Sequence, residues 1–204
     1  MTAALSLPAH ADGYLPDDWE TREWTVDQLA SFPTDLRYEL IDGRLVLPSP
    51  TMLHQVLANL VWMALYKLCP PHLVVSTGTS LEINKKNEPR PDVVIARKSR
   101  GLRSPVPVED SLLAIEVISP SSSPRDVHRK PMIYAAAGIA DYLIIDPSTE
   151  PEIVLWHFRL SQTGHYELLG TATGEFSTDQ PFPLTIDLQV LTATRKDFRD
   201  HGES

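Results

Sequence analysis

Pro91-Asp92-Val93-Val94-Ile95-Ala96 and Leu112-Leu113-Ala114-Ile115-Glu116-Val117-Ile118 are two runs of strand-forming residues, and each run carries one acid. A charge among apolar strand residues is costly to bury unless a partner pairs with it. If the two runs pair antiparallel about the loop between them, Asp92 and Glu116 lie at the same end of the hairpin. Two carboxylates held side by side repel each other, and a divalent cation is a common way to relieve that repulsion.

The bulk composition is that of a globular protein, with 204 residues, 42% hydrophobic and 22% charged. This length predicts one domain with short extensions. A net charge of −9 argues against a broad, non-specific nucleic-acid surface but leaves room for a local basic groove. The single cysteine, Cys69, cannot form an intramolecular disulfide, and this fits a reducing cytoplasm. We expect neither a signal peptide nor a membrane span, because the longest apolar stretch, 56–68, is interrupted by polar residues.

Local signals before Asp92 predict three elements. Thr25, with Gln28 in capping-box spacing, begins a short helix. Asp42-Gly43 separates two strand-like runs and predicts a tight hairpin. Ser49 is the expected N-cap of a longer helix, with Pro50 at its first position and apolar residues every three or four positions as far as Leu68.

The chain after Glu116 continues with a serine- and proline-rich loop and a helical stretch that Gly138 closes. Pro131 lies inside that stretch, where it either starts the regular part of the helix or kinks it. Strand patterns follow at 141–145, 153–159 and 166–169. This alternation favours a single α/β domain with a mixed sheet. We expect it to span 22–193, after a mobile arm at 1–21 and before a polar tail at 194–204.

The candidate site combines acids with one lysine: Glu39, Asp92, Glu116 and Lys130. Oxygen ligands of this kind suit Mg²⁺ or Mn²⁺, and a lysine can position water or offset developing negative charge. Asp126, Lys130 and Tyr134 recur every four residues, so they share one face if the helix is continuous. His54 is a candidate lining residue, whereas the other histidines considered have no ligand spacing and are expected at the surface: His128, His157 and His165.

Each residue also has an ordinary interpretation. Glu39 could be a solvated strand residue, Asp92 a turn cap and Lys130 a surface lysine. Glu116 is harder to explain in this way, since its neighbours are apolar; a structural ion pair is the main alternative.

Six short motifs occur in sequence order, and together they resemble the Uma-two family of restriction-endonuclease-like proteins, within the PD-(D/E)XK nuclease superfamily. The resemblance covers roughly residues 22–170. The motifs are Tyr38-Glu39-Leu40-Ile41-Asp42-Gly43, Ser49-Pro50 with His54, Pro91-Asp92, Glu116-Val117-Ile118-Ser119-Pro120, Arg125-Asp126 with Lys130 and Tyr134, and Gly138-Ile139 with Tyr142 and Asp146-Pro147.

The resemblance implies a restriction-endonuclease-like core, in which helices flank a mixed sheet, and metal-dependent cleavage of DNA. It makes Asp92 and Glu116 metal ligands for Mg²⁺ or Mn²⁺, and Glu39 an additional acid. The usual lysine position, two residues after the second acid, is Ile118 here, so the lysine comes from the next helix as Lys130. A homodimer is a further expectation from the superfamily. Two alternatives stay open: a binding or assembly module without activity, and a hydrolase of another phosphate ester.

Overall fold

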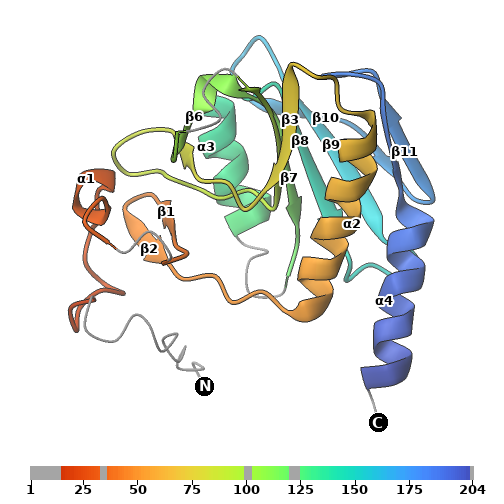
Figure 1. Ribbon diagram of the computed structural model, residues 1–204, viewed down its shortest axis with the longest axis horizontal. Helices are drawn as coiled ribbons and strands as arrows, with labels where there is room; N and C mark the ends of the chain where they lie inside the picture. The colour runs from red at the N-terminus through yellow and green to blue at the C-terminus, as the bar shows by residue number, and fades with distance from the viewer. Residues whose placement is uncertain (1–14, 33–35, 99–102, 120–124, 203–204) are drawn as a thin grey trace.

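The computed structural model describes residues 15–32, 36–98, 103–119 and 125–202. Within these residues, a six-stranded sheet has the order β10-β9-β8-β7-β5-β3 (Figure 1). Strands β7 and β8 are parallel, and all other neighbours in the sheet are antiparallel. The predicted mixed sheet is therefore confirmed. Its strands are β3 (Leu73–Thr77), β5 (Val93–Arg97), β7 (Ser111–Val117), β8 (Asp141–Asp146), β9 (Val154–Leu160) and β10 (Tyr166–Ala172).

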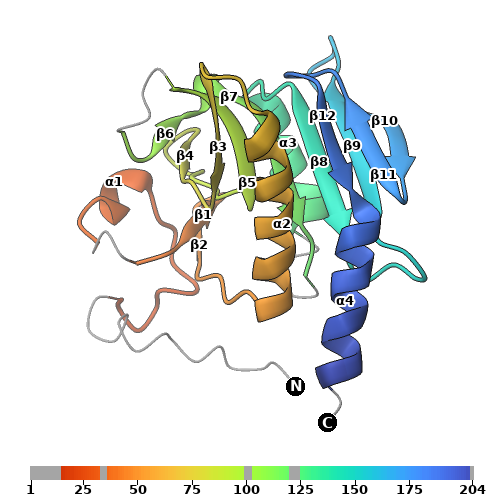
Figure 2. The ribbon, with the colours of Figure 1, turned by 45° about the vertical axis from the view of Figure 1, so that its right-hand side comes forward.

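Helices cover both faces of this sheet, because the strands are apolar on both sides (Figure 2). Helix α2 (Met52–Leu68) packs on one face of the sheet, where it shares a hydrophobic core with Val93 and Ile95 of β5. Helix α3 (Lys130–Ala136) packs on the other face, where Val94 lies. The alternation along β5 thus separates an α2 side from an α3 side. None of the described helices is long and apolar enough to cross a membrane.

The N-terminal elements pack around a second, smaller hydrophobic core, formed by Trp19, Trp24, Leu29, Leu36, Tyr38, Leu40 and Leu45. The hairpin of β1 (Glu39–Ile41) and β2 (Arg44–Val46) turns at Asp42-Gly43, whose φ angles of 50° and 75° give the turn predicted from these two residues. Helix α1 (Val26–Leu29) has the expected capping box at Thr25. The remaining short elements are β4 (Leu81–Glu82), β6 (Val106–Pro107) and the 3-10 turn η2 (Val108–Asp110).

The start of α2 differs from the prediction by two residues. Its N-cap is Thr51, not Ser49, and the helix begins at Met52. The hydroxyl oxygen of Thr51 accepts a hydrogen bond from the backbone N–H of His54, at 3.2 Å. This bond satisfies a helix N–H that would otherwise lack a partner, and it places His54 in the first turn.

Part of the predicted N-terminal arm is packed. Residues 1–14 of the expected 1–21 arm lie outside the described residues. Within 15–21, however, Trp19 is buried in the smaller core, and its carbonyl oxygen accepts a hydrogen bond from the indole N–H of Trp24 at 3.0 Å. Burial of a large aromatic side chain holds this segment against the domain.

Residues 194–202 of the expected polar tail at 194–204 form the second half of a helix, and residues 203–204 lie outside the described residues. Helix α4 (Leu188–Gly202) follows the hairpin of β11 (Glu175–Thr178) and β12 (Leu184–Asp187) and lies beside α2 (Figure 1). Leu188 and Leu191 pack in the main core, and Arg195 continues the same face. The last buried residue of this face is therefore charged. For this reason the sequence from Thr194 onward shows no apolar pattern and predicts a tail.

Arg195 is expected to be a major stabilising residue outside the candidate site. Its side chain is buried, and its guanidinium donates hydrogen bonds to the carbonyl oxygens of Pro147 (2.9 Å), Pro151 (2.7 Å) and Thr149. Arg195→Met would leave these carbonyl oxygens without their charged donor and should lower the free energy of unfolding by about 3 kcal/mol. For a chain of this size, we expect the Tm to fall by roughly 6–12 °C.

Thermal unfolding of Arg195→Met and of the neighbouring exposed variant Lys196→Met checks this expectation. The surface substitution should change stability by no more than about 0.5 kcal/mol. Equal Tm values for the two variants would show that the carbonyl contacts of Arg195 do not stabilise the fold.

Candidate functional site

Asp92 and Glu116 lie at the same end of the sheet, as the hairpin argument predicts. Strands β5 and β7 are antiparallel with Val93 opposite Ile115, so the two acids come next to each other in the register. The Oδ2 atom of Asp92 accepts a hydrogen bond from the backbone N–H of Val117, the residue after Glu116, at 2.8 Å. This bond ties one acid to the strand that carries the other.

The ammonium group of Lys130 lies among three carboxylates. Its Nζ atom is 2.9 Å from Oε1 of Glu39, 3.0 Å from Oε1 of Glu116 and 3.1 Å from Oδ1 of Asp126. All four side chains are buried. A lysine from α3 thus reaches the acids of β1 and β7, and it contacts the acid one turn before it in its own helical segment.

Pro131 does not misdirect this lysine. Residues Arg125–Arg129 form a π-helical turn, and the regular helix α3 begins at Lys130 with Pro131 as its second residue. Within α3 the first turn needs no backbone N–H donor, so proline is tolerated at this position directly after the π turn. The π turn still brings Asp126 and Lys130 together, and such turns are frequent at functional sites.

Two further contacts position the acids. The hydroxyl of Tyr134 donates a hydrogen bond to Oε1 of Glu116 at 2.9 Å. The backbone N–H of Arg90 donates to Oε1 of Glu39 at 2.8 Å. Glu39 and Glu116 each use Oε1 for these bonds and for the contact with Lys130.

Burial and neighbouring charges shift the pKa values of Glu116 and Lys130. Burial raises the pKa of Glu116 well above its ordinary value, and the charges of Asp126, Asp92 and Glu39 raise it further, although Lys130 opposes the shift. Burial alone would lower the pKa of Lys130, but the surrounding carboxylates outweigh it and raise that pKa well above its ordinary value. Lys130 therefore stays protonated among the carboxylates of Glu39, Glu116 and Asp126.

His54 reaches the cluster from α2. Its Nε2 lies 3.1 Å from Oδ2 of Asp92. Burial would lower the pKa of His54, but the hydrogen bond and the charge of Asp92 outweigh it and raise the pKa. The Nδ1 atom of His54 is buried and has no hydrogen-bond partner within the described ranges. His54 is thus held by Asp92 at the end of the sheet.

The donor set at Asp92 and Glu116 fits a hard cation. The bonds described above use Oδ2 of Asp92 and Oε1 of Glu116, so Oδ1 and Oε2 take no part in them. Among the described side chains, no three His, Cys, Asp or Glu residues form a complete metal site by themselves. Mg²⁺ does not need one, because it usually binds one or two carboxylates and keeps waters or substrate phosphates as its other ligands.

A polar cavity of about 410 Å³ opens beside Asp92. Sequence reasoning missed most of its lining. Arg90 directly precedes Pro91-Asp92, and this adjacency is the one signal that could have identified it. The other residues come from α2, from the end of β3 and, as Arg37, from the segment before β1, and only the fold brings them to the site. The lining residues are Arg37, Gln55, Ala58, Asn59, Thr77, Gly78, Arg90 and Asp92.

The network contains all seven side chains predicted for the site, namely Glu39, His54, Asp92, Glu116, Asp126, Lys130 and Tyr134. One histidine expected at the surface is buried elsewhere. His157 contacts Oδ1 of Asp141 at 2.7 Å, and its ring packs edge-on against Phe176. Side chains alternate between the two faces of β9, and His157 shares its face with Leu155, which is buried in the core on the α2 side. His128 and His165 are exposed, as predicted.

Comparison with known proteins agrees with this geometry. The chain matches, over residues 24–191, a family model described as "Uma2: Putative restriction endonuclease". A crystal structure described as "a putative nuclease belonging to DUF820 from Anabaena variabilis ATCC 29413" has the same fold, with a TM-score of 0.64 at 17% identity. The match covers 84% of this chain and 98% of that chain. No curated protein matches the chain. Because the family model spans most of the chain and every residue of the network, the chain belongs to the Uma2 restriction endonuclease family, and this membership and the fold together support a nuclease.

Proposed function

We propose that this protein is a metal-dependent endonuclease that hydrolyses DNA phosphodiester bonds, with Mg²⁺ or Mn²⁺ held by Asp92 and Glu116. The observation that carries the proposal is the meeting of Asp92 and Glu116 at one end of the sheet, beside an open polar cavity that Asp92 lines. A buried carboxylate with a strongly raised pKa is unfavourable for stability, and such arrangements are concentrated at functional sites.

In this proposal, some residues of the site bind the metal and others orient the residues that bind it. A bound cation would supply a Lewis acid that stabilises charge on the phosphodiester and lowers the pKa of water. Asp92 and Glu116 would hold it, while His54 and the N–H of Val117 orient Asp92. Tyr134 orients Glu116 through Oε1.

Lys130 acts through the acids in this proposal. An ammonium has three N–H donors, and three carboxylate oxygens lie within 3.1 Å of Nζ. We therefore assign Lys130 the role of gathering Glu39, Glu116 and Asp126 and of placing one fixed positive charge beside the reacting phosphate. The fixed charge corresponds to one of the two roles considered from the sequence, the offsetting of developing negative charge, and not to the other, the positioning of water.

Addition of Mg²⁺ or Mn²⁺ to metal-free protein is expected to raise the Tm. At a concentration ten times its Kd, the metal stabilises the folded state by about 1.4 kcal/mol, which corresponds to roughly 3–6 °C for a chain of this length. DNA cleavage should appear with the same metals and stop in EDTA. Differential scanning fluorimetry and a gel assay on supercoiled plasmid and circular single-stranded DNA measure both effects.

Glu116→Gln is the matched control for this titration. Since the pKa of Glu116 is raised in the folded protein, its contribution favours folding most below the ordinary Glu pKa and is lost as the pH rises through the raised value. Glutamine cannot ionise, so the metal-free variant should be more stable than the wild type at pH 8 and should gain nothing from Mg²⁺. A wild type that shows neither a metal-dependent Tm nor cleavage would instead support a binding module that retains the fold.

A further inference from the structure

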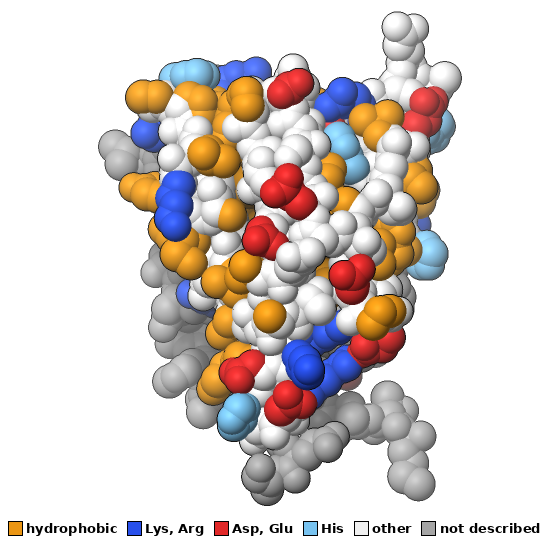
Figure 3. Space-filling model, turned by 90° about the vertical axis from the view of Figure 1, so that its right-hand side faces the viewer, with side chains coloured by type: hydrophobic (Ala, Val, Ile, Leu, Met, Phe, Trp, Pro, Cys, Tyr) orange, Lys and Arg blue, Asp and Glu red, His pale blue; other side chains and the backbone are white. Residues whose placement is uncertain are grey.

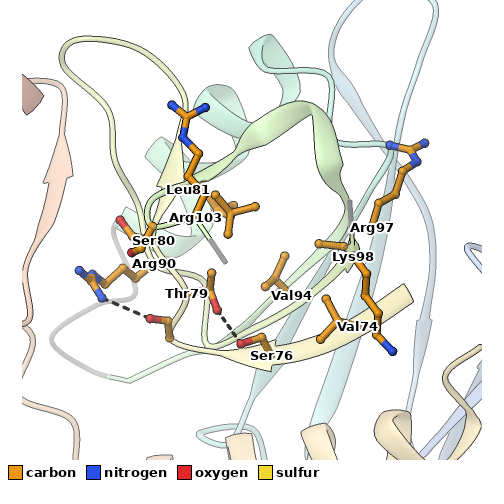
Figure 4. Close-up of a pocket in the computed structure, with 14 residues that line it drawn as sticks. Val74, Ser76, Thr79, Ser80, Leu81, Arg90, Val94, Arg97, Lys98 and Arg103 are labelled. Atoms are coloured by element: carbon orange, nitrogen blue, oxygen red, sulfur yellow. Dashed lines mark hydrogen bonds between the residues drawn. The ribbon is translucent and has the colours of Figure 1, made fainter. Parts of the chain in front are cut away.

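A second, larger pocket of about 1100 Å³ lies on the α3 side of the sheet (Figure 4). Its floor is apolar, with Val74 from β3 and Val94 and Ala96 from β5. Leu81 of β4 and Val106 of β6, which form a two-stranded parallel pair, also line it. The pocket thus lies over the edge strand β3 and its neighbour β5, and it has room for a ligand larger than a metal ion and its waters.

This pocket is adjacent to the candidate active site. Gly78 and Arg90 line both the larger pocket and the cavity beside Asp92. The backbone N–H of Gly78 bonds the carbonyl oxygen of Asp92 at 3.3 Å. Side chains two apart on a strand share a face, and each residue advances about 3.3 Å, so the floor at Val94 begins roughly 7 Å along the chain from Asp92. A ligand in the pocket would therefore lie next to a phosphate at the acids.

The rim of the pocket is cationic. Figure 4 shows Arg90 and Arg103 on one side and Arg97 and Lys98 on the other, with Val74 and Val94 between them. No Asp or Glu is among the described residues that line it. The lining thus differs from the chain as a whole, which has a net charge of −9. It also differs from the face shown in Figure 3, which carries acidic side chains across its middle.

Two of these cations are held in position. The guanidinium of Arg97 donates to the carbonyl oxygen of Glu109 at 2.9 Å, and that of Arg103 donates to Glu82 at 2.7 Å. Lys98 is exposed at the rim next to Arg97. An apolar floor under a positively charged rim is complementary to a ligand with an apolar body and an anionic group.

We propose that this pocket receives an unpaired nucleotide of the strand whose neighbouring phosphodiester lies at Asp92 and Glu116, with the base on the apolar floor and the phosphates against the cationic rim. The inference rests on the proposed nuclease function and narrows its substrate class. A base inside a duplex is stacked and paired, so it must leave the helix before it can enter a pocket. That cost is lowest for a single strand, a flap or a mismatched nucleotide. The pocket therefore favours such DNA over an intact duplex.

Binding in EDTA tests the inference without cleavage. Fluorescence anisotropy compares a labelled 12-nucleotide thymidine strand with the duplex that contains it. We expect the single strand to bind about ten-fold more tightly than the duplex. Lys98→Glu should remove most of that difference and reduce the dependence of log Kd on log salt by about one. Val74→Trp, which fills the floor from an edge strand, should weaken single-strand binding with little effect on the duplex.

Lys196→Glu is the control, because it makes the same charge change at an exposed site on α4. Tm values show whether each variant is folded. The inference is overturned if the duplex binds as tightly as the strand, or if Lys98→Glu behaves like Lys196→Glu. Competition with thymidine monophosphate shows whether the pocket binds a DNA strand or a free nucleotide. If it competes at concentrations similar to those of the strand, the pocket is a mononucleotide site and the proposal fails.

The two proposals can fail separately. If the metal-dependent nuclease assay is positive but the pocket variants bind like the wild type, the substrate inference fails and the nuclease function stands. If the pocket variants lose single-strand binding but no metal supports cleavage, the protein binds strands and does not cut them.

Discussion

Lys130→Met is expected to have the largest effect on stability of any single substitution in the site. The change removes the positive charge that lies within 3.1 Å of Glu39, Glu116 and Asp126 and leaves these acids buried together. Breaking a buried ion pair by removal of one partner costs about 3–5 kcal/mol, because the remaining charge is uncompensated. The Tm at neutral pH should fall by roughly 6–20 °C.

The pH dependence of this variant should distinguish charge from packing. Without Lys130, the buried carboxyls can relieve their repulsion only by taking up protons, so their pKa values rise further. Stability should then recover as the pH falls towards the ordinary Glu pKa of about 4.3. It should be lost as the pH rises through the raised pKa values of the buried carboxyls. Thermal unfolding between pH 4.5 and pH 8 measures this recovery.

Two comparisons make the result for Lys130→Met interpretable. Lys67→Met removes an exposed lysine on α2 and should leave the Tm nearly unchanged at every pH. The double variant Lys130→Met with Glu116→Gln removes one of the stranded charges and should be more stable than Lys130→Met alone. A loss of stability that is the same at pH 4.5 and pH 8 would mean that lost packing, and not uncompensated charge, dominates.

Asp92→Asn is expected to have the largest effect on activity. The amide oxygen of asparagine can still accept the hydrogen bond from Val117, so the strand ends should remain joined. A neutral amide is a much weaker ligand for Mg²⁺ than a carboxylate, and loss of about 4 kcal/mol of transition-state stabilisation lowers the rate about 10³-fold. The cleavage rate should therefore fall by at least about 10³-fold, while the Tm changes by only a few degrees.

Initial cleavage rates in Mg²⁺, together with the Tm of each variant, measure this separation of activity from stability. Asp200→Asn makes the same chemical change at an exposed position of α4 and should cut DNA at the wild-type rate. Cleavage by Asp92→Asn within ten-fold of the wild type would be incompatible with Asp92 as a metal ligand. Unfolding of Asp92→Asn would show that its bonds to Val117 and His54 are mainly structural.

Much of the fold could be predicted from local sequence because the signals act over a few residues. Asp42-Gly43 requires positive φ angles and predicts its hairpin. The apolar runs around Asp92 and Glu116 predict two buried strands, and their antiparallel pairing brings the acids to one end. The four-residue spacing of Asp126, Lys130 and Tyr134 predicts one face, which is found although a π turn precedes the regular helix.

The sequence alone therefore determined the mixed sheet, the pair of strand-borne acids and the helix face that holds Lys130, because hydrophobic periodicity and turn chemistry are local. Only the tertiary structure decided which groups share charge. It surrounds Lys130 with acids from three elements, buries Arg195 of α4, and places the Asp92 cavity beside a cation-rimmed pocket, with Gly78 and Arg90 lining both. These arrangements depend on contacts between residues far apart in the chain. Whether a charged side chain is buried with a partner or exposed to water is decided by those contacts and not by its neighbours in sequence.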